Sequence, residues 1–66
     1  MRITVNGQQQ EADDVLGLAE LVGRISDRDT GIAVALNGEV VPRGSWSGTP
    51  VRPGDRVDVV TAVQGG

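Results

Sequence analysis

Three stretches of the chain alternate hydrophobic and polar residues with a period of two, which is the spacing of half-buried β-strands. They are residues 2–5, residues 32–36 and residues 56–63. Each stretch therefore predicts a strand in which one face is apolar and the remaining residues lie on the opposite face. The positions that share the apolar face within each strand are Ile3 and Val5, then Ile32, Val34 and Leu36, then Val57, Val59, Thr61 and Val63.

Two Asn-Gly pairs follow the first two of these strands, at Asn6-Gly7 and Asn37-Gly38. Both positions of a two-residue hairpin loop need positive φ, and Asn-Gly meets that need best. Each pair therefore predicts a β-hairpin. The return strand at residues 8–12 is nearly all polar, which is typical of a sheet edge. The second return strand covers residues 39–41 and ends at Pro42, because proline cannot donate to a strand ladder.

One helix is predicted between the two hairpins, with Asp13-Asp14 as its N-cap. Five apolar residues follow at helical spacing and fall within an arc of about 120°. Leu16 lies outside this arc and has no place in the pattern. Two glycines within the helix weaken it, so the helix needs a surface on which to pack. The arc consists of Val15, Leu18, Leu21, Val22 and Ile25, and the glycines are Gly17 and Gly23.

The remaining segments are predicted to be a loop at residues 43–50 and a type II turn at residues 52–55, where proline and glycine occupy the central positions. Trp46 is the only aromatic residue of the sequence. It can close the end of the small core or contact a partner, and the core is the preferred interpretation.

These elements predict a single α+β domain over residues 1–66. The pattern contains four or five strands with one apolar face each and one amphipathic helix. All of these apolar faces are buried when the helix packs on one face of a mixed sheet. The first and last strands form the natural parallel central pair, because no tight turn joins them.

Amino-acid composition narrows the range of possible functions. The net charge is −3, from nine acidic residues and six basic residues, all of them arginine, so nucleic acid is not an expected partner. The sequence contains no Cys, His or Lys, and so lacks the common nucleophile–base pairs and metal ligands. We expect a protein without catalytic residues or a metal site. No apolar run reaches the ~18 residues of a membrane span, and a cytoplasmic location is expected.

Four sequence features together resemble a known family. They are Leu36-Asn37-Gly38, then Val41-Pro42-Arg43 with Trp46 three residues later, then Gly54-Asp55, and the final Val63-Gln64-Gly65-Gly66. With the order of elements, they resemble the ubiquitin-like β-grasp fold and, more narrowly, the thiamine-biosynthesis sulfur carriers. The chain departs from that family at Asp14, where a threonine N-cap is common, and at the two helix glycines.

The resemblance implies that Gly66 is the modified residue. In the family, an adenylyltransferase of the ubiquitin-activating type uses ATP to adenylate the terminal carboxylate. Sulfur from a donor protein then gives a thiocarboxylate, which delivers sulfur to thiazole synthase. The carrier itself binds no cofactor. By the same resemblance, Gly65 and Gln64 belong to a flexible tail that enters the partner's active site.

The residues of the tail suit this chemistry. A terminal carboxylate is ionised at neutral pH and is a poor electrophile, so it needs a leaving group before sulfur can attack. Two glycines can pass a constriction that a Cβ atom would block. Ordinary fraying of a chain end is the alternative explanation of Gly65-Gly66.

A candidate partner surface follows from the strand phases. If the apolar faces of two strands meet the helix, then Ala33, Ala35, Val60 and Ala62 point away from it. The open face of a one-sided sheet is usually polar, so small apolar residues next to the tail indicate contact with the activating enzyme. The alternative is that these are ordinary surface residues.

Three other functions remain open at this point. A molybdopterin-type sulfur carrier would share the activation step but serve a different acceptor. A ubiquitin-like modifier would join its terminal glycine to other proteins. A pure binding module would make no use of its last residues.

Overall fold

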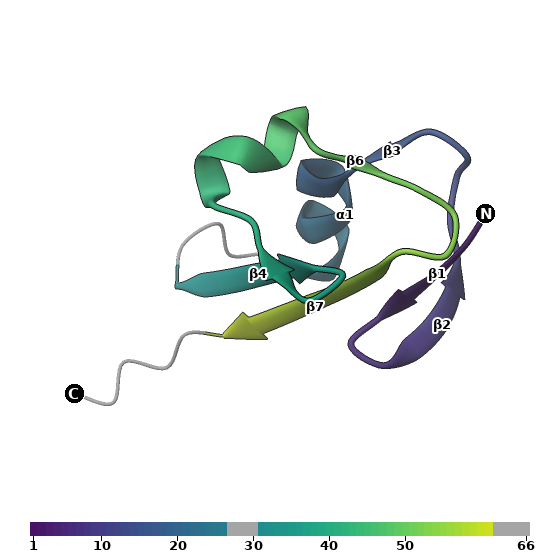
Figure 1. The fold of residues 1–66 in the computed structure, drawn as a ribbon, viewed down its shortest axis with the longest axis horizontal. Helices are drawn as coiled ribbons and strands as arrows, with labels where there is room; N and C mark the ends of the chain where they lie inside the picture. Colours follow the sequence, from purple (N-terminus) through teal and green to yellow (C-terminus); the bar gives the residue numbers. More distant parts are fainter. Residues whose placement is uncertain (27–30, 62–66) are drawn as a thin grey trace.

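The computed structural model describes residues 1–26 and 31–61 (Figure 1). A five-stranded mixed sheet has the order β2-β1-β7-β4-β5, and one helix lies across one of its faces. This arrangement confirms the predicted α+β class. The strands of the sheet are β1 (Arg2–Val5), β2 (Gln8–Glu11), β4 (Ile32–Leu36), β5 (Glu39–Val40) and β7 (Arg56–Thr61).

The centre of the sheet is the predicted parallel pair. β1 and β7 run parallel, with Thr4 opposite Arg56 and Val5 opposite Val57. β7 also pairs antiparallel with β4 along the full length of β4. Every residue of β2 is exposed, as expected for an edge strand. The last strand of the chain is therefore held between two neighbours.

Both predicted hairpins are present. Asn6 and Gly7 have φ values of 49° and 81°, and Asn37 and Gly38 have values of 53° and 86°. Positive φ at both loop positions is the geometry that favours Asn-Gly in two-residue hairpins. The turn before β7 also has the expected positive φ at its glycine, with 85° at Gly54.

The predicted start of the helix is wrong. Helix α1 spans Leu18–Ile25 with Gly17 as its N-cap, so Asp13-Asp14 does not cap it. Leu16 and Gly17 instead form β3, which pairs antiparallel with β6 (Pro50–Val51). The first helical N–H, that of Leu18, donates to the carbonyl oxygen of Thr49 at 2.8 Å. A distant segment therefore supplies the cap that local sequence was expected to provide.

Two side chains near this helix differ from their predicted places. Val15 is 90% exposed and does not belong to the buried arc, whereas Leu16 is 3% exposed and belongs to the core. The strand pairing is the cause, because it turns Leu16 toward Val51 and leaves Val15 outside. Ile25, at the other end of the arc, is also largely outside the core.

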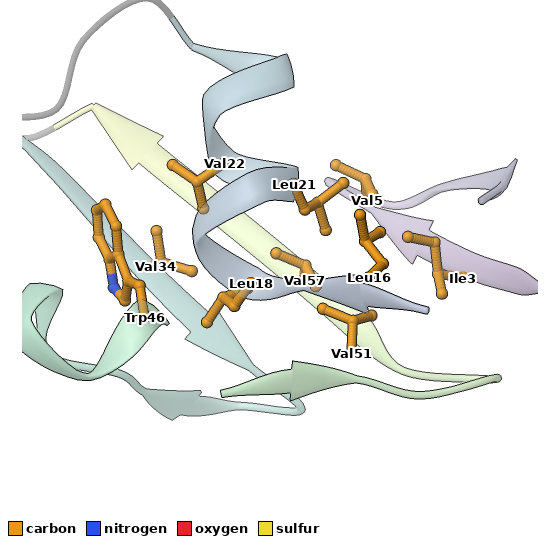
Figure 2. Close-up of a cluster of buried hydrophobic side chains, with 10 residues drawn as sticks. All are labelled: Ile3, Val5, Leu16, Leu18, Leu21, Val22, Val34, Trp46, Val51 and Val57. Atoms are coloured by element: carbon orange, nitrogen blue, oxygen red, sulfur yellow. The ribbon is translucent and has the colours of Figure 1, made fainter. Parts of the chain in front are cut away.

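The core lies between the helix and the sheet (Figure 2). Leu18, Leu21 and Val22 of α1 face the apolar sides of β1, β4 and β7. Trp46 closes one end from a 3-10 helix, η1 (Arg43–Gly48), which occupies the segment predicted as a loop. The indole Nε1 donates to the carbonyl oxygen of Val41 at 2.8 Å, so the core interpretation of Trp46 is confirmed.

Candidate functional site

The face of the sheet turned away from α1 carries the candidate partner surface. Ala33 of β4 lies directly opposite Val60 of β7, and both are exposed, Val60 at 59%. Ala35 is half-buried on the same face, opposite Asp58. The structure thus brings together three of the four predicted residues, and the fourth, Ala62, lies outside the described residues.

A further apolar residue joins this group. Val40 of β5 pairs with Ala35 and is 72% exposed. Sequence analysis missed it, although the two-residue turn at Asn37-Gly38 fixes the hairpin register and so places residue 40 opposite residue 35. We call Ala33, Ala35, Val40 and Val60 the tail-side patch.

The rest of this open face is polar. Arg56 and Asp58 of β7 form an ion pair, with Nε and Oδ2 at 3.2 Å. Toward the other edge of the sheet, Arg2 and Glu11 form a second pair at 3.5 Å. Such exposed pairs contribute little to stability, and they are typical of a solvated surface. The tail-side patch is therefore an apolar area at one end of an otherwise polar face.

Val60 and Ala33 of the patch lie at the end of β7 that leads to the C-terminus, and Ala35 lies two residues further back, opposite Asp58. Five residues follow Thr61 in the sequence, and a fully extended segment of that length spans at most about 18 Å. Gln64, Gly65 and Gly66, the predicted tail, lie outside the described residues. A partner that binds Gly66 must therefore come within about 18 Å of Thr61.

Neither a metal cluster nor a membrane-spanning helix is found in the described part of the chain. Within residues 1–26 and 31–61, no three acidic side chains are arranged to hold a metal ion. In the same two ranges, no helix has the length and hydrophobicity needed to cross a membrane.

A groove of about 560 Å³ lies at the other end of the molecule. It follows the β3–β6 pair and includes the exposed Val15 together with Pro50 and Pro53. In Figure 1, β3 and β6 lie far from the C-terminal end of β7. The groove is therefore separate from the predicted site, and its residues serve as a control surface in the tests below.

Comparisons with known proteins agree on one family. The family model described as the ThiS family matches residues 3–66. "Sulfur carrier protein ThiS" of Escherichia coli (strain K12) is 30% identical over 66 residues, covering 100% of both chains. "Thiazole synthase" of Paramagnetospirillum magneticum (strain ATCC 700264 / AMB-1) is 27% identical over 66 residues. That match covers 100% of this chain but only 20% of the other protein.

Solved structures give the same result. The crystal structure of the thiamine biosynthesis protein (ThiS) from Geobacter metallireducens matches with a TM-score of 0.87 and 33% identity, over 100% of both chains. Its solution structure matches with a TM-score of 0.81 over 100% of this chain and 88% of that one. These matches confirm the ubiquitin-like β-grasp fold and favour the thiazole branch over the molybdopterin branch.

Proposed function

This chain belongs to the ThiS family of sulfur carrier proteins of thiamine biosynthesis, and on that premise we propose that Gly66 carries the sulfur. A ubiquitin-activating-type adenylyltransferase joins the terminal carboxylate to AMP from ATP and releases pyrophosphate. A persulfide of a donor protein then attacks the carbonyl carbon and displaces AMP, and a thiol cleaves the resulting acyl disulfide to give the thiocarboxylate on Gly66 and a disulfide on the donor side. The observation that carries this proposal is the apolar tail-side patch beside the strand that leads to Gly66.

The proposed recipient of the sulfur is thiazole synthase. Support comes from the Paramagnetospirillum protein of that name, because a region amounting to 20% of its length is similar to this whole chain. A thiazole synthase that contains a carrier-like region brings carrier and acceptor into one molecule.

The chain acts as a cosubstrate in this scheme. The partners supply the ATP site and the catalytic groups, since the sequence contains no Cys, His or Lys that could serve as nucleophile or base. The carrier contributes a narrow C-terminus and a surface that places it. We propose the cytoplasm as the compartment in which it works.

We assign the tail-side patch to the activating enzyme. Val60 and Val40 expose most of their side chains to solvent, and burying apolar area against a partner is favourable at about 25 cal/mol per Å². Ala33 and Ala35 are small, so a partner surface can approach β4 closely. Contact here fixes the domain within the roughly 18 Å reach of the C-terminal residues.

Substitution of Gly66 tests the proposed chemistry. Gly66→Val places a branched side chain on the reacting residue, where the chain must pass through a confined site, so pyrophosphate exchange should fall by a factor of about 100 or more. Gly44→Val is the matched control, because an added Cβ at Gly44 meets nothing within 4 Å. Circular dichroism should show the same fold for both. Normal exchange by the Gly66 variant would remove Gly66 from the mechanism.

A second pair of variants tests the patch. Val60→Asp puts a charge into the proposed interface and should raise the KM for the carrier about tenfold in pyrophosphate exchange. Val15→Asp makes the same change at a residue that is 90% exposed at the other end of the molecule, and should leave KM unchanged. Equal effects of the two substitutions would show that the tail-side patch is ordinary surface.

A further inference from the structure

The strand pairing of β1 with β7 ends at Val57, the second residue of β7. Two backbone hydrogen bonds of 2.9 Å join the segments here: Thr4 N of β1 donates to the carbonyl oxygen of Asp55, just before β7, and Asn6 N, just after β1, donates to the carbonyl oxygen of Val57. The chain then turns away at Asn6-Gly7. In Figure 1, β7 continues past this turn toward the C-terminus.

The side chain of Asn6 adds one more bond after the turn. Its Oδ1 accepts a hydrogen bond from the backbone N–H of Val59 at 2.8 Å. The side-chain oxygen thus takes the place that the backbone carbonyl of Asn6 would have if the parallel ladder continued. Beyond it, Val60 and Thr61 pair with β4, opposite Ala33 and Ile32. Among the described strands, no pairing to β1 extends that far.

We propose that Asn6 is a positioning residue for the activation of Gly66. This inference rests on the proposed function, and it adds a residue from the opposite end of the sequence to it. By binding Val59, Asn6 holds the last part of β7 in the sheet. The tail-side patch and the base of the C-terminal segment then keep a fixed relation.

The physical argument concerns fraying. Strand ends open with free energies close to zero. Loss of one hydrogen bond raises the equilibrium constant for such an opening about fivefold. Each residue that leaves the sheet moves the anchor of the C-terminal segment by about 3.3 Å, which is as large as the separation of atoms poised to react. An enzyme that binds only carrier molecules with an ordered β7 then finds fewer of them. Its apparent affinity for the carrier falls in proportion to the ordered fraction.

Asn37 is a built-in control for this argument. It occupies the same position of the same kind of turn, and its Oδ1 accepts from the backbone N–H of Arg56 at 2.9 Å. Its Nδ2 also donates to the side-chain Oδ1 of Asp55 at 3.0 Å, a bond that has no counterpart at Asn6 among the described residues. All of these bonds lie at the start of β7, far from the C-terminal segment. A general effect on stability would appear at Asn37 at least as strongly as at Asn6.

The experiment compares Asn6→Gly, Asn6→Asp and Asn37→Gly in pyrophosphate exchange with the activating enzyme. Glycine keeps the positive φ of the turn and removes the acceptor. Aspartate tolerates the same φ and keeps an acceptor oxygen. We expect Asn6→Gly to raise the KM for the carrier about threefold with kcat unchanged. Asn6→Asp should have a KM close to that of the unaltered chain, and Asn37→Gly should leave KM unchanged.

Amide hydrogen exchange of the free protein supplies the second measurement. In Asn6→Gly, the amides of Val59 and Val60 should exchange about fivefold faster, with little change at Val34. A normal KM in Asn6→Gly, or an equal rise in Asn37→Gly, would overturn the positioning role. Absence of exchange activity in the unaltered chain would instead overturn the proposed function, and amide exchange would still decide whether Asn6 holds β7.

Discussion

Trp46 and Leu16 show what single residues reveal about the core. Trp46 was predicted correctly, because the sequence offers no other aromatic side chain to close a small core. Leu16 found no place in the helical pattern, and its neighbour Val15 was placed in the core wrongly. The reason is that residue 16 belongs to a strand whose partner, Val51, lies 35 positions later in the sequence. No local periodicity carries that information.

Truncation of these neighbours gives a prediction at the residue scale. Leu16→Ala should lower the free energy of unfolding by about 2–5 kcal/mol, because it leaves a cavity in the core. Val15→Ala should change it by less than about 0.5 kcal/mol, because that side chain is 90% exposed. Urea denaturation followed by circular dichroism measures both. A larger effect at Val15 would contradict the β3–β6 pairing.

Among the elements, hairpins were predictable and the helix start was not. An Asn-Gly turn is specified by two residues that must both take positive φ, so its signal is local and both turns were found. The helix begins where Thr49 accepts the N–H of Leu18, and this bond joins segments 31 positions apart. Asp13-Asp14 satisfied the local rule for an N-cap but lies too early in the chain. Sequence signals were therefore reliable for the turns, whose geometry depends on adjacent residues, and unreliable for the helix start, which depends on a distant segment.

The candidate surface follows the same division. Strand phase alone placed Ala33, Ala35 and Val60 on the open face, because successive side chains of a strand alternate between faces. Val40 required the hairpin register as well. Asn6 required the three-dimensional relation of β1 to β7, since its partner Val59 is 53 positions away. Candidate residues thus became harder to predict as their contacts became less local.

For the molecule as a whole, the fold separates two tasks. One layer, the helix with η1 and the β3–β6 pair, buries the core against the sheet. The other side of the sheet carries the tail-side patch, whose Val60 precedes Thr61, the last described residue of β7. In the proposed function, this separation would let a partner reach Gly66 without disturbing the packing that holds β7.

The most direct test of the account is the mass of the untagged chain isolated from cells that are making thiamine. Before analysis, the chain is treated with a thiol-alkylating reagent and fragmented. The sequence contains no Cys thiol, so an alkylated sulfur on the C-terminal fragment, away from Met1, identifies a thiocarboxylate. We predict that part of the chain has one oxygen replaced by sulfur, alkylated and located on Gly66. A chain with no such species, or with sulfur located elsewhere, would contradict the claim that Gly66 carries it.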